Sequence, residues 1–233
     1  MNKCVFCVVL VFLCAAGRIQ GAEVELWPEI EPYKSGFLKV SEIHKIYYEL
    51  CGNRTGKPIF VLHGGPGGSC SPYMRRFFNP EVFQIVLHDQ RGAGKSRPSA
   101  EIKENNTQHL VADIEQLRRQ LKLDKIILFG GSWGSTLALA YGQAYPEHVS
   151  VMIRRGVLTA TRAEIDHFYH GGVRMFFPEV LDRFVGGLPK PDTRPIPEYL
   201  FSLIESPDLQ QRSKYSRLWA AYEIKICGLD IPD

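Results

Sequence analysis

The sequence predicts an α/β protein built on a mostly parallel sheet. Short apolar runs, typical of strands buried on both faces, alternate with stretches of helical periodicity, which is the pattern of β-α-β units. Three of these runs end directly in glycine-containing loops. The length of 233 residues, the 45% apolar content and the net charge of +3 fit a globular domain and exclude a disordered chain, a small disulfide scaffold and a strongly basic nucleic-acid-binding domain.

The expected elements follow in order. Residues 37–40 and 45–50 form two short strands around a polar turn, and residues 59–62 and 83–87 form buried strands. A helix with Thr107 as its N-cap comes next, because its apolar residues recur at helical spacing. These residues are Leu110, Ile114, Leu117 and Leu121.

The second half of the sheet is expected from two further apolar runs. Residues 125–129 form a buried strand, and residues 149–153 form the next one. An apolar helix from Ser135 to about Tyr145 lies between them and is ended by Pro146. From about residue 161 aromatic residues and prolines accumulate, which indicates a mostly helical region laid over the sheet.

The amino terminus has the features of a secretory signal peptide. Lys3 precedes an apolar run over residues 4–16, and small residues follow up to Ala22. We therefore expect residues 1–21 to be removed and the protein to be secreted, without stable membrane insertion afterwards. The alternative is a buried helix or a short anchor. Cysteines 51, 70 and 227 would remain, and their odd number leaves any pairing open.

The segment Gly130-Gly131-Ser132-Trp133-Gly134 contains the Gly-x-Ser-x-Gly pattern of a nucleophile elbow. The turn is strained, and a Cβ at either flanking glycine would collide with the neighbouring strand or helix. The turn lifts the serine Oγ to the end of the sheet, where the N–H of Trp133 can face a developing oxyanion. The alternative interpretation is that this segment is only a structural turn between a strand and a helix.

The segment from His63 to Gly68 (His-Gly-Gly-Pro-Gly-Gly) also follows a strand. Glycine lets the backbone approach a substrate closely, so the N–H of Gly65 is the candidate second oxyanion donor. His63 could act as a base, but its place before the glycines favours a structural role in shaping the loop.

A third polar segment, His88 to Ser96, ends in a sequence similar to a phosphate-binding loop. The first glycine of that motif would fall at Asp89, so the spacing excludes it. We expect Asp89 and Arg91 to brace the loop under the site through charge-assisted hydrogen bonds. Neither a cofactor nor a metal is expected.

Taken together, these motifs resemble the proline iminopeptidase (prolyl aminopeptidase) family of α/β-hydrolase serine peptidases. The resemblance covers nearly all of residues 36–226. It rests on segments 63–68, 89–96 and 130–139, and continues through Arg155-Gly156, Phe168-Tyr169, Phe177-Pro178-Glu179 and Trp219 to Glu223.

The resemblance implies an α/β-hydrolase core over residues 22–160 and a helical cap over residues 161–233. In that family fold Ser132 would be the nucleophile, and the N–H groups of Gly65 and Trp133 would form the oxyanion hole. The implied substrate is a peptide with a free N-terminus, and no nucleic-acid partner is implied. The family is mostly cytoplasmic, which is the alternative to secretion, and the oligomeric state stays open.

The resemblance also implies the substrate pocket. Glu223 would bind the free amino group as a partly buried carboxylate facing an ammonium. The proline ring would lie in a pocket shaped by Arg155, Phe168 and Tyr169. The sequence departs from the family pattern at several pocket positions, which loosens the aromatic lining and the selectivity for proline. The departures are Leu158, Thr159 to Thr161, His167 and Tyr222.

The catalytic base and acid are not evident after Ser132. On this fold they follow the nucleophile in the order Asp, His, at the ends of later strands. No Asp or His after Ser132 follows a predicted buried strand. We therefore expect a C-terminally truncated member with an incomplete cap and without the last core strands, inactive as written. The alternatives are a non-catalytic binding protein and a broader ester or amide hydrolase.

Overall fold

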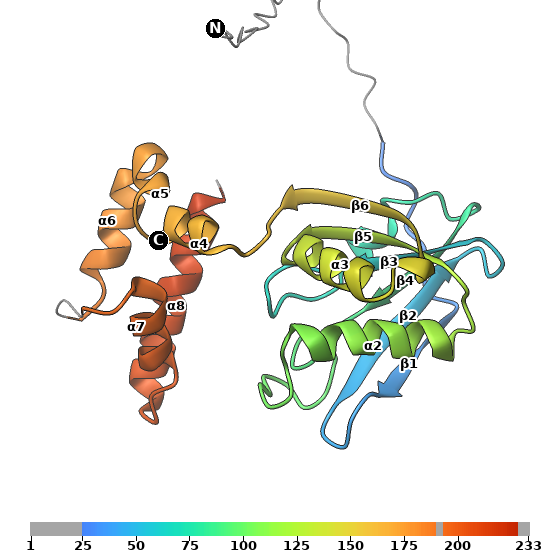
Figure 1. Cartoon of the computed structure of the whole chain (residues 1–233), viewed down its shortest axis with the longest axis horizontal. Helices are drawn as coiled ribbons and strands as arrows, with labels where there is room; N and C mark the ends of the chain where they lie inside the picture. The colour runs from blue at the N-terminus through green and yellow to red at the C-terminus, as the bar shows by residue number, and fades with distance from the viewer. Residues whose placement is uncertain (1–24, 190–192, 228–233) are drawn as a thin grey trace, which may run out of the picture.

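The computed structural model describes residues 25–189 and 193–227, so the predicted signal peptide lies outside the described residues. A sheet flanked by helices is followed by a separate group of helices, joined to it by one short segment (Figure 1). Within these ranges no helix combines the length and apolarity needed to cross a membrane.

The sheet of the described chain has six strands in the order β1-β2-β4-β3-β5-β6. The strands β1 and β2 are antiparallel to their neighbours, whereas β4, β3, β5 and β6 run parallel, which confirms the predicted mostly parallel α/β fold. The strands are β1 (Lys34–Lys39), β2 (Lys45–Gly52), β3 (Lys57–Leu62), β4 (Phe83–His88), β5 (Ile126–Ser132) and β6 (Val149–Val157).

Two helices cover one face of this sheet. The helices α2 (Thr107–Gln120) and α3 (Trp133–Ala144) lie on one face, where Ile114, Leu117 and Leu137 are fully buried (Figure 1). The short helices α1 (Pro72–Arg75) and η1 (Pro146–His148) complete this part. The opposite face buries a smaller apolar cluster that includes Phe78 and Ile85.

The N-cap of α2 differs from the prediction. The cap is Asn106, whose side chain accepts a hydrogen bond from the N–H of His109, and Thr107 is the first helical residue. Both residue types are good caps. The extended backbone of Asn106 decides between them, because a capping residue must have non-helical dihedral angles.

Two strands run further than their apolar residues predict. The strand β5 extends to Ser132 and β6 extends to Val157. The extra residues pair in register, Gly130 with Arg154 and Gly131 with Arg155, so backbone hydrogen bonding continues where the side-chain pattern ends.

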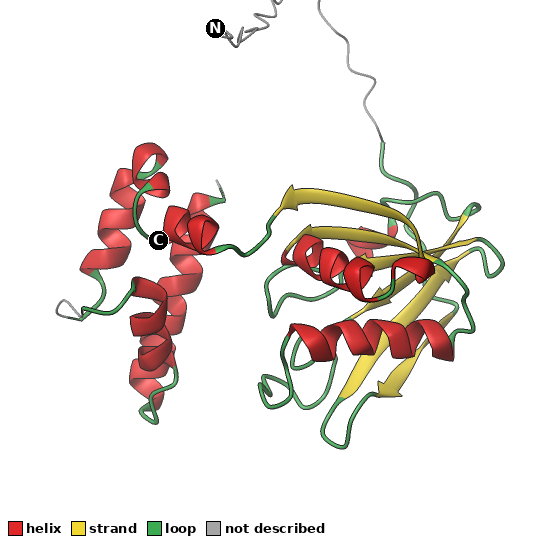
Figure 2. Ribbon diagram, in the orientation of Figure 1, coloured by secondary structure: helices red, strands yellow, loops and turns green. Residues whose placement is uncertain are grey.

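A second, entirely helical lobe follows β6 (Figure 2). It has its own apolar core, in which Leu181, Phe184 and Leu200 are almost completely buried. Its helices in the described chain are α4 (Arg162–Tyr169), α5 (Gly172–Phe176), α6 (Pro178–Gly186), α7 (Ile196–Ile204) and α8 (Leu209–Ile226).

The segment between the lobes is attached to the start of α3. The N–H of Leu158 donates to Ser135 Oγ at 2.9 Å, and its carbonyl accepts from Thr136 Oγ1 at 2.7 Å. A capping box between Thr161 and Glu164 then starts α4. The entry to the helical lobe is therefore tied to the helix that follows Ser132.

Candidate active site

Ser132 lies on a strained turn between β5 and α3. Its φ of 54° and ψ of −125° are unusual for a residue with a Cβ. A Cβ on Gly130 would lie 2.2 Å from the carbonyl oxygen of Gly134, and one on Gly134 would lie 2.1 Å from that of Leu62. Both glycines of the Gly-x-Ser-x-Gly pattern are thus required by close backbone approaches.

The loop from His63 to Gly68 lies against this turn. A Cβ on Gly64 would be 3.4 Å from Ser132 Cβ and 4.0 Å from its Oγ. Gly65 has a φ of +119°, and a Cβ there would meet the amide nitrogen of Gly67 at 2.6 Å. Trp133 is the first residue of α3, where backbone N–H groups have no partner within the helix. Two glycine-rich segments and a helix N-terminus therefore converge on Ser132.

His63 shapes the loop, as its position in the sequence predicts. Its Nε2 accepts from the backbone N–H of Gln90 at 3.0 Å, so its Nδ1 carries the proton and donates to the carbonyl of Gly64 at 2.9 Å. Burial lowers the pKa of His63. With both ring nitrogens engaged, this buried imidazole has no atom left to accept the proton of Ser132.

Gln90 is a buried site residue that the sequence analysis did not single out. Its Nε2 donates to the carbonyl of His63 at 2.9 Å, and its Oε1 accepts from the indole Nε1 of Trp133 at 3.0 Å. The side chain thereby links the glycine-rich loop to the residue after Ser132. The sequence signal that could have identified Gln90 is its position, two residues after the end of the buried strand β4.

Asp89 and Arg91 brace the loops beneath the site, as predicted. The carboxylate of Asp89 accepts from the N–H groups of Cys70 and Lys95, both at 2.8 Å. Arg91 makes a two-point contact with Asp113, at 2.7 Å for each hydrogen bond. Burial raises the pKa of Asp113, and the Arg91 guanidinium opposes that shift.

Ser132 lines a cavity of about 400 Å³ at the junction of the two lobes. Phe168, from α4, is one of its walls, together with Val157 and Leu158. Glu164 and His167 also line it. They lie one helical turn apart on α4 and so point to the same side. The sequence suggested no role for either residue beside Ser132.

The remaining predicted pocket residues lie elsewhere. Tyr169 is buried in the core of the helical lobe, where its hydroxyl donates to Glu223 Oε1 at 3.3 Å and accepts from Trp219 Nε1 at 2.8 Å. Glu223 is exposed, contrary to the expected partly buried carboxylate, and does not line the Ser132 cavity. The reason is helical geometry, because the neighbouring Tyr222 stacks on Phe184 in the core and turns Glu223 outward.

Arg155, on β6, does not line the Ser132 cavity. It lines a separate cavity of about 300 Å³ together with Trp27, Phe77 and Phe129. A Cβ on Gly131 would lie 3.1 Å from its Cζ, so the guanidinium packs against the elbow.

The cysteine thiols of the described chain do not line the Ser132 cavity. Cys51, Cys70 and Cys227 are free thiols there. Burial raises the pKa of Cys51 to about 12 and also raises that of Cys70, which keeps both thiols protonated. In residues 25–189 and 193–227, no group of three metal-ligating side chains is found. The strand β6 ends at Val157, and Leu158 rather than Asp or His follows it.

Comparison with known proteins identifies the family of this chain. Residues 57–230 match the family model described as the alpha/beta hydrolase fold. The proline iminopeptidase of Xylella fastidiosa (strain Temecula1 / ATCC 700964) is 43% identical over 198 residues, which cover 85% of this chain and 63% of that protein. The proline iminopeptidase of Arabidopsis thaliana is 45% identical over 200 residues, 85% of this chain and 53% of that protein.

The fold is also found among solved structures. The crystal structure of VinJ matches with a TM-score of 0.61 at 17% identity, over 83% of this chain and 61% of that chain. At this identity the match concerns the fold alone. The chain spans 53–63% of the length of the two proline iminopeptidases described above. Its identities of 43% and 45% to them confirm the predicted resemblance to that family.

Proposed function

This chain belongs to the α/β-hydrolase family, and on that basis we propose that it carries the nucleophile of a serine aminopeptidase. The proposed reaction releases an N-terminal proline, or another small residue, from a peptide. The observation that carries the proposal is the φ of 54° at Ser132, held between two glycines that tolerate no Cβ. Such strain in a non-glycine residue is typical of a functional position.

The proposed chemistry has two steps. Ser132 Oγ attacks the carbonyl carbon of the first residue, and the N–H groups of Gly65 and Trp133 bind the oxyanion that forms. The C–N bond breaks, the amine of the shortened peptide leaves with a proton, and water then hydrolyses the acyl-enzyme ester. Each step requires a base for the proton of the attacking oxygen.

Substrate selection is proposed to depend on the helical lobe. Phe168 lines the Ser132 cavity and supplies an apolar wall for a small first residue. We assign Glu223 to the free amino group, with Tyr169 holding its carboxylate through the hydroxyl at 3.3 Å. The assignment requires the substrate to reach an exposed carboxylate outside the Ser132 cavity.

A broader ester or amide hydrolase is the second candidate. Glu164 and His167 give the Ser132 cavity polar walls, and Leu158 replaces an aromatic wall. A mixed lining of this kind selects less sharply for a proline ring than a fully aromatic one.

We also propose that the 233-residue chain, made as written, turns over slowly. His63 is engaged at both ring nitrogens, and the residue directly after β6 is Leu158 rather than Asp or His. A serine nucleophile without an oriented base loses most of its rate, whereas oxyanion stabilisation and binding are retained. Secretion remains a proposal that rests on residues 1–21, and N-terminal sequencing of the protein from its native source tests it.

The test combines covalent labelling with turnover. A fluorophosphonate probe is expected to label Ser132 in the native chain and in the control Ser213→Ala, an exposed serine on α8, but not in Ser132→Ala. Slow hydrolysis of a prolyl arylamide, lost only in Ser132→Ala, would support the aminopeptidase.

Three other results would overturn parts of the proposal. Hydrolysis of simple esters without hydrolysis of prolyl amides would favour the broader hydrolase. A native chain whose Ser132 stays unlabelled even after prolonged exposure to the probe would favour a non-catalytic binding protein. Turnover of about 10 s⁻¹, an ordinary enzyme rate, would show that a base is present.

A further inference from the structure

A second cavity lies beside the nucleophile turn and has no role in the chemistry described above. Its volume is about 550 Å³. The glycine-rich loop at Pro66 and Gly67, the loop from Ala100 to Thr107, Trp133 and Phe201 of α7 line it. We propose that this cavity binds the side chain of the second residue of the peptide substrate, and that it selects an apolar one. The proposal rests on the proposed aminopeptidase function.

The position of the cavity follows from the geometry of the acyl transfer. A carbonyl carbon attached to Ser132 Oγ has its oxyanion toward the N–H groups of Gly65 and Trp133. Two substituents remain, the first residue and the leaving amine with the rest of the peptide. Ser132 lines the cavity of about 400 Å³, and Trp133, the next residue in the chain, lines the one of about 550 Å³. The structure thus provides one volume for each substituent.

Three polar side chains around the larger cavity, those of Arg91, Asn105 and Gln90, are already engaged with the protein. Arg91 is held by both oxygens of Asp113, each at 2.7 Å. Asn105 Nδ2 donates to the carbonyls of Arg91 and Glu101, at 3.0 and 3.1 Å. The amide of Gln90 joins the loop to Trp133, as described above. A ligand would therefore gain few new hydrogen bonds from these side chains.

Two apolar side chains of this cavity, in contrast, are exposed and available to a ligand. Ile102 is 74% exposed and Phe201 is 48% exposed, and both line the cavity, as do Leu110 and Pro66. Phe201 is held edge-to-face by Trp219, with ring centroids 5.4 Å apart. Covering exposed apolar surface with an apolar side chain is favourable.

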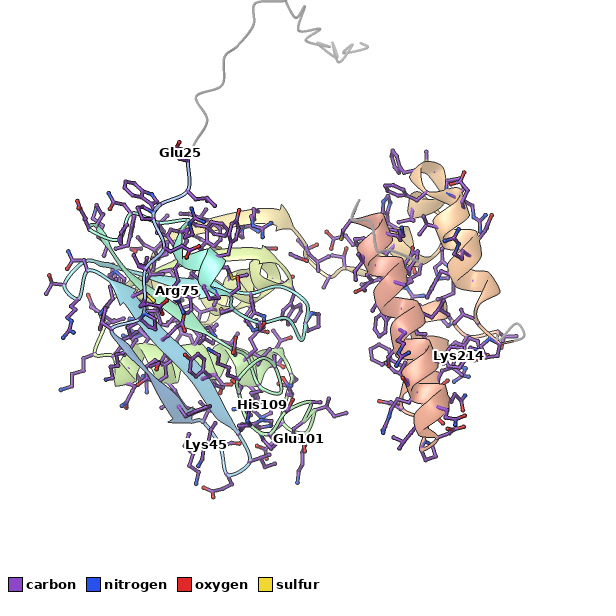
Figure 3. The ribbon with its side chains drawn as sticks, turned by 180° about the vertical axis from the view of Figure 1, so that it is seen from behind. Glu25, Lys45, Arg75, Glu101, His109 and Lys214 are labelled. Carbon is purple, nitrogen blue, oxygen red and sulfur yellow. The ribbon has the colours of Figure 1, made fainter. Side chains whose placement is uncertain are left out.

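Charge disfavours an acidic residue in the same place. Glu101 lies on a wall of this cavity, at the opposite end of the sheet-containing lobe from Glu25 (Figure 3). Its carboxylate would repel an acidic side chain. The expected order of preference for the second residue is therefore phenylalanine or leucine, then glycine, then aspartate.

The experiment measures equilibrium binding to the full chain carrying Ser132→Ala, so that the readout does not depend on turnover. Calorimetry compares Pro-Phe-NH₂, Pro-Gly-NH₂ and Pro-Asp-NH₂. We expect the phenylalanine peptide to bind about tenfold more tightly than the glycine peptide, since one apolar side chain in such a pocket gives discrimination of about this size. Adding Phe201→Ala should reduce this ratio to less than about threefold.

The matched control is Phe176→Ala, an aromatic residue of the same lobe that is 70% exposed and lines neither cavity. It should leave the ratio unchanged. Equal binding of the phenylalanine and glycine peptides would overturn the subsite even if the chain released proline from both. A Phe201→Ala effect on the first residue, measured with Ala-Gly-NH₂ against Pro-Gly-NH₂, would also overturn it. If the subsite exists but Ser132 is not a nucleophile, the binding ratio persists while the fluorophosphonate probe fails to label the chain.

Discussion

The indole Nε1 of Trp133 donates a hydrogen bond to Oε1 of Gln90 at 3.0 Å. Gln90 in turn holds the carbonyl of His63 at 2.9 Å. One amide side chain therefore joins the two segments whose N–H groups are proposed to bind the oxyanion. Their relative position depends on a residue that itself makes no proposed contact with the substrate.

Replacing this amide should loosen the site. Gln90→Ala leaves the Trp133 Nε1 and the His63 carbonyl without these partners, and we expect a loss of about 1–3 kcal/mol in the free energy of unfolding. Urea denaturation measures the stability, and the rate of fluorophosphonate labelling measures the site. Gln108→Ala, an exposed position on α2, is the control and should change neither. Unchanged labelling in Gln90→Ala would show that the bridge does not position the elbow.

The glycines of the elbow should tolerate no side chain. A Cβ on Gly134 would lie 2.1 Å from the carbonyl oxygen of Leu62, so Gly134→Ala should destabilise the chain by more than about 3 kcal/mol or prevent folding. Gly186 ends α6 and has no neighbour within 4 Å of an added Cβ. Gly186→Ala should therefore be neutral or stabilise by about 0.5–1 kcal/mol. Thermal melts of both variants measure these changes in stability. A well-folded Gly134→Ala would contradict the close approach of Gly134 to the Leu62 carbonyl.

The ion pair beneath the site should be costly to break. Arg91 and Asp113 are 2–3% exposed as side chains, and Asp113→Asn leaves the buried guanidinium with only the partly exposed Glu104 carboxylate, 4.0 Å away, as a counter-charge. We expect a loss of about 3–5 kcal/mol. The exposed pair of Arg162 and Asp166 is the control, and Asp166→Asn should cost at most about 0.5 kcal/mol. Similar losses of unfolding free energy for the two variants in chemical denaturation would show that burial does not make the Arg91–Asp113 pair costlier to break.

Stability should fall as the solution is acidified below pH 6.5. His88 ends β4, is buried, and has no partner for its Nδ1 in the described chain. Burial and, secondarily, the neighbouring His63 lower its pKa from 6.5 to about 3. Between these values the unfolded chain binds a proton that the folded chain does not, so acid favours unfolding.

The measurement is urea unfolding between pH 6.5 and 5, above the range in which carboxylates titrate. His88 contributes a slope of up to about 1.4 kcal/mol per pH unit. His63, whose pKa is also lowered by burial, acts in the same sense. His88→Leu should reduce the slope, whatever its effect on stability at pH 7. If the unfolding free energy of the variant changes with pH as steeply as that of the native chain, His88 is not the cause of the pH dependence.

The local features of the fold could be predicted from the sequence. The buried strands are evident because runs such as 59–62 are continuously apolar, and Ser132 is evident because its flanking glycines and its strand-helix context lie within a few residues. The ends of β5 and β6 could not be predicted, because Gly130, Gly131 and Arg155 join the sheet through backbone pairing that leaves no side-chain pattern.

The sequence by itself determined the mostly parallel α/β fold, the strained turn at Ser132 and the structural role of His63, since each depends on residues close together in the chain. Only the tertiary structure decided which distant side chains share a cavity. It brought Glu164 and His167 to the Ser132 cavity and turned Glu223 to the surface of α8. The physical reason is that side-chain direction depends on how each helix packs, and burial of Tyr222 fixed the rotation of α8.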